Sequence, residues 1–306
     1  MERNIHNLLK EPCGVITAKK QLAPLIYEFT VYAPAIVHNA KPGQFVIVYA
    51  RDEMSKPIPL TIADFDEELG TITLVVQAVK TGTMKLVTMN VGDTFYSIQG
   101  PLGHPSEIKQ YDGTIVFVIG GVGVAPAFPV LRALHEAGNQ MRFLVGVRSR
   151  ELFIWEEKIK KYVAPDVFIE DGIKVKFGEL VSPVIRKILI DEKISHVFVA
   201  GPLDMMNGTA EITRKGGAKN TSSAISHMLD GTGMCGGCQC NVGNETILLC
   251  QKGPEIDGNL ADWTLLRTRL NGLKKQEDKY LSEFKANDPL YQVFLKQEKM
   301  FQGGAQ

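Results

Sequence analysis

The sequence lacks an excess of either charge. Its 306 residues include 34 lysines and arginines and 34 aspartates and glutamates, so the formal net charge is +0. Because nucleic acids and anionic membranes attract proteins through a strong electrostatic field, we expect neither as a partner. Small molecules and other proteins are the expected partners, and the length allows two domains, each with its own core.

Long uninterrupted hydrophobic runs are also missing. Residues 113–131 (GTIVFVIGGVGVAPAFPVL) are uncharged, but they contain four glycines and two prolines. A β-branched run followed by a glycine turn is typical of a buried parallel strand that leads into a helix, not of a membrane span. Residues 1–15 lack a signal-peptide pattern, so we expect a cytoplasmic protein.

Cysteine and histidine are both scarce. Four of the five cysteines lie within the sixteen residues 235–250, and Cys13 is far away. A disulfide framework is not expected in a large cytoplasmic chain, so this cluster favours metal or redox chemistry. The six histidines form no convincing Ser/His/Asp arrangement, and we assign no catalytic acid, base or nucleophile.

The chain divides into regions with different patterns of apolar residues. Residues 12–107 contain six short apolar runs separated by turns, which predict an antiparallel barrel with one short helix at residues 81–89. Residues 113–222 alternate strand and helix patterns, with one of the helices expected at residues 151–163, which predicts a parallel sheet covered by helices. In the first of these helices, Pro126 and Pro129 are expected in the opening turn and Gly138 at the end. Residues 262–306 are charged and helical in period, and indicate either a solvated terminal helix or a partner-docking helix.

Asp230, Cys235 and Cys238 reproduce a known ligand spacing. Plant-type 2Fe-2S proteins use a Cys-x4-Cys-x2-Cys segment and a distant fourth cysteine. Cys235 and Cys238 form the x2 pair, Cys250 is the distant cysteine, and Asp230 takes the first position. Because a carboxylate oxygen can ligate iron, we expect these four residues to bind a 2Fe-2S cluster. The loop between them is rich in glycine, which lets it wrap closely around a cluster: Gly231, Gly233, Gly236 and Gly237.

Three alternatives for the cysteines stay open. Cys240 could replace Asp230 as the fourth ligand, although in an extended chain it would point to the side opposite Cys238. A structural zinc site usually has two Cys-x2-Cys pairs, and this chain has one. Free cysteines are also often simply buried in a core.

Taken together, these regions resemble the ferredoxin-NADP reductase superfamily. More narrowly, DGTGMCGGC (230–238), KGPEIDG (252–258), PLTIAD (59–64) and GVGVAP (121–126) resemble the small, alpha subunit of NADH-dependent ferredoxin:NADP oxidoreductase, also called the sulfide dehydrogenase beta subunit. The resemblance covers residues 10–265 and implies a β + α/β fold. We expect an FAD-binding β-barrel at residues 1–110, an NAD-binding α/β domain at 111–223, a 2Fe-2S segment at 224–265 and a C-terminal helical extension at 266–306.

The resemblance also implies which residues contact the cofactors. The flavin would lie along Pro59, Leu60, Thr61 and Ile62, with Thr61 and Ile62 near the isoalloxazine ring. Its pyrophosphate would meet Gly82, Thr83 and Met84, where backbone N–H groups at a helix start can bind an anion. The nicotinamide nucleotide would lie outside the carboxyl ends of the parallel strands, at Gly121, Gly123, Pro126, Gly201 and Pro202. Met205 and Met206 are expected to pack the helix behind this turn.

Three positions depart from the family pattern. Pro57 stands where the family usually has an arginine that contacts a flavin phosphate, and Lys56 beside it lacks arginine's bidentate fork. The glycine run before Val122 is GG where GGG is usual. The family's DDGSxGxxG corresponds here to EDGIKVKFGE at residues 170–179.

The resemblance implies an electron-transfer subunit. It would use FAD and a 2Fe-2S cluster to exchange electrons between NAD(H) and a larger redox subunit of an electron-bifurcating complex. A nicotinamide transfers two electrons as hydride and the cluster carries one, whereas a flavin can do both. Two alternatives stay open: the electron-transfer subunit of class B dihydroorotate dehydrogenase, and a relay or scaffold subunit that has lost nucleotide binding.

Overall fold

The N-terminal third of the chain folds into antiparallel β-structure. The computed structural model describes residues 13–170 and 177–304. The six predicted runs become seven strands, because the run at 59–66 is interrupted after Thr61. The strands are β1 (Val15–Ala23), β2 (Ile26–Tyr32), β3 (Phe45–Tyr49), β4 (Ile58–Thr61), β5 (Asp64–Asp66), β6 (Thr71–Gln77) and β7 (Ser97–Leu102), with the short helices α2 (Pro34–Val37) and α3 (Thr81–Val87).

Two antiparallel sheets enclose the barrel core. Their strand orders are β1-β2-β6-β5 and β4-β3-β7. Phe29 and Leu74 from the first sheet meet Val46 from the second and Leu86 from α3 in one buried cluster. The predicted short helix is therefore present, and it packs against the core of the barrel.

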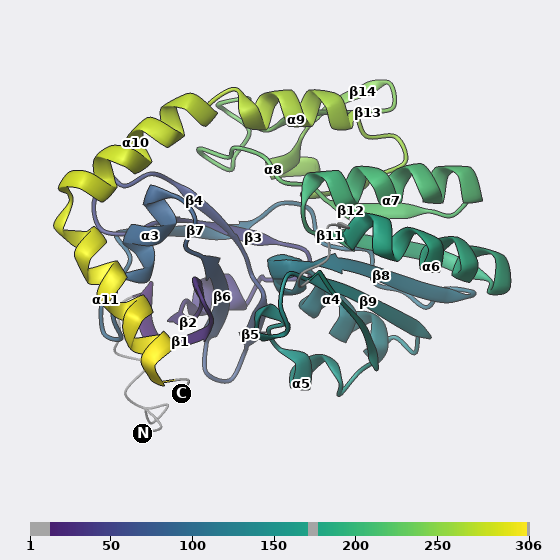
Figure 1. Cartoon of the computed structure of the whole chain (residues 1–306), viewed down its shortest axis with the longest axis horizontal. Coiled ribbons are helices and arrows are strands. Elements are labelled where there is room, and N and C mark those ends of the chain that lie inside the picture. Colours follow the sequence, from purple (N-terminus) through teal and green to yellow (C-terminus); the bar gives the residue numbers. More distant parts are fainter. Residues whose placement is uncertain (1–12, 171–176, 305–306) are drawn as a thin grey trace.

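The second region is a parallel sheet covered on both faces, as predicted (Figure 1). Its strand order is β10-β9-β8-β11-β12, and an antiparallel strand from the C-terminal part, β15 (Glu255–Asp257), extends it beside β12. The parallel strands are β8 (Thr114–Gly120), β9 (Met141–Val147), β10 (Pro165–Ile169), β11 (Ile194–Ala200) and β12 (Asn220–Ser223). The connecting helices are η1 (Gly121–Gly123), α4 (Val124–Glu136), η2 (Arg150–Leu152), α5 (Glu156–Ile159), α6 (Phe177–Asp191) and α7 (Leu203–Gly216).

Alternating side chains of β8 explain why both faces are covered. Phe117 packs in the cluster that contains α4, whereas Val118 packs with Val181 of α6 and Met206 of α7. A strand that is buried on both faces reads as a continuous apolar run. Among the helices of the described residues, none is both long and apolar enough to cross a bilayer.

Two details of these helices differ from the sequence prediction. Pro129 lies inside α4, not in its opening turn, because the helix already begins at Val124. Residues 151–163 form only the four-residue helix α5 beside the 3-10 turn η2. Trp155 precedes α5 with a left-handed φ of 59°, so the chain turns sharply where a longer helix was expected.

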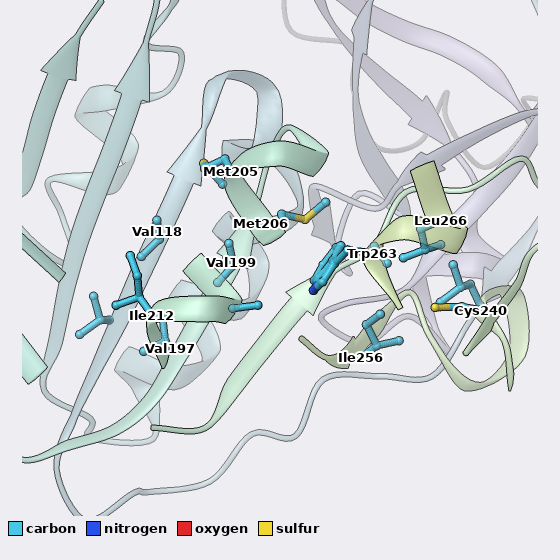
Figure 2. Close-up of a cluster of buried hydrophobic side chains, with 14 of the residues drawn as sticks. Val118, Val197, Val199, Met205, Met206, Ile212, Cys240, Ile256, Trp263 and Leu266 are labelled. Atoms are coloured by element: carbon cyan, nitrogen blue, oxygen red, sulfur yellow. The ribbon is translucent and has the colours of Figure 1, made fainter. Parts of the chain in front are cut away.

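The C-terminal third connects the sheet to the barrel. It contains the hairpin β13 (Gln239–Val242) and β14 (Glu245–Leu248), followed by α8 (Leu249–Lys252), α9 (Trp263–Asn271), α10 (Lys274–Asn287) and α11 (Pro289–Gly304). Figure 2 shows Trp263 and Leu266 of α9 in one buried cluster with Ile256, Met206 and the strands of the sheet.

The last two helices pack against the barrel. In Figure 1 they run along the outside of the barrel, past α3. Phe284 of α10 and Phe294 of α11 are buried in the barrel core. The two helices are therefore only partly solvated, because most of α10 is exposed while apolar residues of both helices cover the barrel.

Candidate functional site

The carboxylate of Asp230 organises the cysteine loop. It accepts hydrogen bonds from the backbone N–H groups of Thr232 (2.6 Å), Gly233 (3.0 Å) and Cys235 (2.7 Å). Hydrogen bonds from Cys235 and Thr232 hold the pKa of Asp230 well below its usual range. Asp230 is therefore an anionic oxygen donor at neutral pH, and the loop N–H groups converge on a negative charge.

The path of this loop requires glycine. Gly231, Gly233 and Gly236 have positive φ angles of 73°, 91° and 64°, a region that other residues rarely adopt. The expectation that glycine lets the chain turn tightly here therefore has a structural basis in the backbone.

The three proposed cysteine ligands differ in solvent exposure. Cys235 is exposed, whereas Cys238 and Cys250 are 1% and 2% exposed. The N–H of Cys250 donates to Sγ of Cys238 at 3.4 Å, and the N–H of Gly237 donates to Sγ of Cys235 at 3.4 Å. Backbone donors directed at cysteine sulfurs are typical of iron-sulfur sites, where they tune the potential.

The buried thiol of Cys250 is suited to a metal partner. Burial, together with Cys238 and the charge of Asp230, raises the pKa of Cys250 to about 12. Only thiolates ligate metals, so this sulfur needs a compensating positive charge before it can lose its proton. The iron ions of a bound cluster would supply that charge, and a donor set of three sulfurs and one carboxylate has the chemistry to hold such a group.

Cys240 is the third buried cysteine of this segment, beside Cys238 and Cys250. It is 0% exposed and packs in the apolar cluster with Trp263 and Leu266, as Figure 2 shows. Burial raises the pKa of its thiol to about 11. The same buried cluster also contains Cys238 and Cys250, and Sγ of Cys240 donates to the carbonyl of Asn241 at 3.6 Å. The preference for Asp230 over Cys240 as the fourth ligand therefore stays a prediction.

The contacts within the loop are pairwise. In the described part of the chain, no three His, Cys, Asp or Glu side chains have the spacing for a single metal ion. A 2Fe-2S cluster distributes its ligands over two irons.

Gln251 also supports the loop, because its amide donates to the carbonyl of Thr232 at 2.7 Å. The sequence analysis missed Gln251, whose only signal is its position beside Cys250.

The cysteine loop lies directly on the barrel. A Cβ at Gly231 would come within 2.6 Å of Leu102 Cδ1 and 2.8 Å of Ile47 Cδ1, so β3 and β7 contact the loop backbone. The hydroxyl of Tyr49, at the end of β3, donates to the carbonyl of Leu229 at 3.3 Å. The loop is thus fixed against the β4-β3-β7 sheet.

The predicted flavin strand is the neighbour of β3. Pro59 of β4 pairs with Ile47, so both side chains lie on the face that carries the cysteine loop. Pro59 is exposed and Thr61 is half-buried, whereas Leu60 and Ile62 point into the barrel core. Only Pro59 and Thr61 of this segment can offer side chains to a flavin, and Ile62 is enclosed by the barrel.

The second predicted flavin segment lies close to the first. A Cβ at Gly82 would contact only Ile58 of β4, at 3.5 Å, and its φ is not positive. Neither packing nor backbone conformation requires a glycine here, and the missing side chain leaves the backbone accessible. Thr83 bonds back to the N–H groups of Val79 and Lys80, and Met84 is buried in the barrel core.

The two predicted nucleotide turns touch each other. They follow β8 and β11, the neighbouring strands at which the sheet changes its direction of winding. A Cβ at Gly123 would lie 2.2 Å from the carbonyl oxygen of Ala200, and one at Gly120 would lie 2.6 Å from Pro202 Cδ. Open α/β sheets bind ligands at this switch point. Pro126 lies in the first turn of α4, and Met205 and Met206 are buried, as expected for helix packing.

Two contacts fix the barrel against the nucleotide domain. Arg132 of α4 forms an ion pair with Asp64, just after the flavin strand, at 2.5 Å. The indole N–H of Trp155 donates to Glu28 at 2.6 Å. The segment 170–179 was named above as a departure from the family pattern, and the structure does not describe its residues 171–176.

Comparison with known proteins shows the family. The model of the iron-sulfur cluster binding domain of dihydroorotate dehydrogenase B matches residues 226–261. An uncharacterized protein in the adh 3' region of Clostridium beijerinckii is 38% identical over 86% of this chain and 92% of its own length. A "Dihydroorotate dehydrogenase B (NAD(+)), electron transfer subunit homolog" from Thermotoga maritima is 34% identical over the same shares. The chain belongs to the family of these electron transfer subunits and their homologues.

Solved structures agree with this family and its fold. A structure of an NADH-dependent reduced ferredoxin-NADP oxidoreductase, described for flavin-based electron bifurcation, matches with a TM-score of 0.83 and 32% identity, over 90% of this chain and 99% of that chain. Phthalate dioxygenase reductase matches with a TM-score of 0.52 and 16% identity, over 83% and 78% of the two chains, which shows the fold alone. The predicted family and the predicted β + α/β class are therefore confirmed.

Proposed function

We propose that the chain is an electron-transfer subunit that binds FAD, a 2Fe-2S cluster and NAD(H), and exchanges electrons with a larger redox subunit. When bound, FAD would exchange hydride with the nicotinamide and single electrons with the cluster. The chain's part is to hold these groups in adjacent positions. Asp230, Cys235, Cys238 and Cys250 would hold the cluster.

One observation carries this proposal. Ile47 contacts the backbone of Gly231 in the cysteine loop and pairs with Pro59 of the flavin strand. Because paired residues of antiparallel strands share a face, the proposed cluster loop and the proposed flavin strand lie on one side of one sheet. Electron transfer between two groups needs this proximity.

The remaining site residues have complementary roles. Pro59 and Thr61 would line the flavin with their side chains, and Leu60 and Ile62 would hold the strand in the barrel. Gly82 and Thr83 would place backbone N–H groups at the pyrophosphate, whereas the N–H of Met84 donates to the carbonyl of Lys80 and its side chain packs in the barrel core. Gly121, Gly123, Pro126, Gly201 and Pro202 would form the nicotinamide site, and the Asp64–Arg132 ion pair would keep it at a fixed distance from the flavin strand.

The domain boundaries are part of the proposal. We assign residues 1–110 to FAD binding, 111–223 to NAD binding, 224–265 to the cluster and 266–306 to the extension. Strand β15 lies in the cluster segment but extends the nucleotide-domain sheet, so these two units share a core. A cytoplasmic location is also proposed, since all five cysteines are free thiols.

A second function has specific support. The matched cluster domain and several relatives carry the name dihydroorotate dehydrogenase B, and one of them, from Bacillus cereus, is 27% identical over 78% of this chain. The bifurcating-type structure matches more of the chain and at higher identity than the Bacillus cereus subunit, whereas the Thermotoga maritima homolog matches at 34% identity over 86% of this chain. Affinity isolation of the native complex distinguishes them: a dihydroorotate-oxidising partner favours the second function, and a larger subunit with further redox centres favours the first.

Cofactor analysis tests the proposal. The chain, reconstituted anaerobically with iron, sulfide and FAD, should contain about one flavin, two irons and two sulfides. Asp230→Ala should lose the cluster and keep the flavin, whereas Cys240→Ala should keep both. If Asp230→Ala kept its full iron content and Cys240→Ala lost iron, the fourth ligand would be Cys240 and not Asp230. A wild-type chain that binds neither group would overturn the function.

A further inference from the structure

The C-terminal arm, residues 274–304 of α10 and α11, contacts both ends of the helix that we assign to the flavin. Lys80, which precedes α3, pairs with Glu277 of the arm at 2.8 Å, and Lys85 in the last turn of α3 pairs with Asp288 at 2.7 Å. Helices of this length are not stable alone, so the position of the seven-residue α3 depends on its packing.

The arm also meets the segment before the flavin strand. The ammonium group of Lys56 lies 4.0 Å from the centre of the Tyr280 ring of α10, within range of a cation–π contact. Lys56 is the cation beside Pro57, the position at which the resemblance predicts an arginine. The arm therefore contacts both chain segments that would surround the flavin phosphates.

A cavity of about 290 Å³ lies between the arm and the start of α3. Val79 and Lys80 line it on the barrel side, and Leu270, Asn271, Lys274, Glu277, Asp278 and Leu281 line it on the side of α9 and α10. The arm thus borders open space beside Val79 and Lys80, which precede α3.

Glu298 of α11 attaches the arm to the barrel. It is 7% exposed, and its carboxylate accepts hydrogen bonds from Gln21 Nε2 (2.9 Å), from the N–H of Leu25 (3.1 Å) and from the hydroxyl of Tyr27. Leu25 has a left-handed φ of 63°, so Glu298 also stabilises a strained hairpin turn. Burial and the contact with Glu298 raise the pKa of Tyr27, and its phenol remains a donor at all ordinary pH values.

Apolar packing completes the attachment. Phe284 and Phe294 are 4% and 3% exposed and lie in the same buried cluster as Met84, Leu86 and Val87 of α3. One side of α3 therefore packs on the barrel, and the arm covers the same cluster from outside.

We propose that the C-terminal arm is a positioning element for FAD, which holds α3 in its binding position through the buried anchor Glu298. This inference rests on the proposed flavin site. If release of the arm leaves α3 correctly placed in only about a tenth of the molecules, the apparent FAD dissociation constant rises about tenfold.

The test compares full-length variants by FAD titration of the apoprotein, with flavin fluorescence as the signal. Glu298→Gln keeps the shape of the side chain and removes its charge, and it should raise the FAD dissociation constant about tenfold while cluster iron stays at the wild-type level. Glu283→Gln, an exposed glutamate of the same arm, is the matched control and should bind FAD like the wild type.

A second variant separates positioning from folding. Lys85→Glu should weaken FAD binding, and the added change Asp288→Lys should restore it, because the ion pair is re-formed with reversed charges. The hydrogen-exchange rate of the α3 amides should rise in Lys85→Glu and return toward the wild-type rate in the double variant. Unchanged FAD affinity and α3 exchange in both Glu298→Gln and Lys85→Glu would overturn the inference. A wild-type chain that binds no FAD would overturn the proposed flavin site itself.

Discussion

The cysteine loop at residues 230–238 and the nucleotide turn at residues 120–123 are both rich in glycine, for different physical reasons. In the turn, Gly123 is needed because another backbone lies 2.2 Å from where its Cβ would be. In the loop, Gly231, Gly233 and Gly236 all have positive φ angles. Cβ atoms at Gly231 and Gly233 would also meet side chains at 2.6 Å and 2.5 Å, whereas one at Gly236 would meet nothing closer than 3.7 Å. Close backbone packing therefore explains Gly123 of the turn, and backbone conformation alone explains Gly236 of the loop.

The largest effect is expected when a proposed cluster ligand that lies outside the loop, in α8, is removed. Cys250→Ser should abolish most of the cluster, because a buried sulfur ligand is lost, while FAD content stays unchanged. Iron, sulfide and flavin analysis measures both. Cys13→Ser, at the exposed cysteine outside the loop, is the control and should retain full iron. Equal iron in the two variants would show that Cys250 is not a ligand.

In the turn, a single methyl group should destabilise the fold. Gly123→Ala places Cβ against the Ala200 carbonyl, and overpacking of this kind costs about 1–3 kcal/mol or more. Gly121→Ala meets no atom within 4 Å and should cost only about 1 kcal/mol, for its positive φ of 54°. Urea unfolding compares the two. A larger loss in Gly121→Ala would contradict the packing explanation.

Strand β15 joins the two regions, and Glu255 makes its stability depend on pH. Burial raises the pKa of Glu255 from 4.5 to about 7, against the opposing effect of its hydrogen bond from Ser106. A raised carboxyl pKa stabilises the fold below the unfolded value, and this contribution is lost as pH rises through about 7. The urea midpoint should therefore fall between about pH 5 and pH 8. Glu255→Gln should reduce that fall, and the exposed Glu245→Gln should not. An identical pH dependence in Glu255→Gln and the wild type would refute this role.

The smallest expected effect concerns the support of the loop. Gln251→Ala removes one hydrogen bond to Thr232, which is worth about 1 kcal/mol. The reconstituted cluster should be released faster during chelator challenge, with iron content unchanged at the start. Release at the wild-type rate would mean that the Asp230 hydrogen bonds alone maintain the loop.

Much of the fold could be predicted because local pattern and burial agree. The apolar run at residues 115–119 is buried on both faces of the sheet, and Thr81 begins a helix where the pattern indicates one. The long helix expected at residues 151–163 was wrong, since Trp155 adopts a left-handed backbone that no periodicity reveals.

The candidate site was predictable only where spacing carries the information. The positions of Asp230, Cys235 and Cys238 indicate their own chemistry. The support of the loop by Gln251 depends on tertiary contact, and so does the anchoring of α11 by Glu298, which bonds to Tyr27 on a strand near the other end of the chain. In the sequence, nothing distinguishes Glu298 from the other charged residues of its helix, and only the folded structure shows its contacts with the barrel.

An anaerobic titration with NADH tests the central claim most directly. The reconstituted chain is followed by flavin absorbance and by the EPR signal of the reduced cluster. The proposed function predicts that stoichiometric NADH bleaches the flavin and that the reduced-cluster signal then appears. If NADH changes neither signal while dithionite reduces both centres, the chain alone has no working nicotinamide site, and the relay function replaces the one proposed.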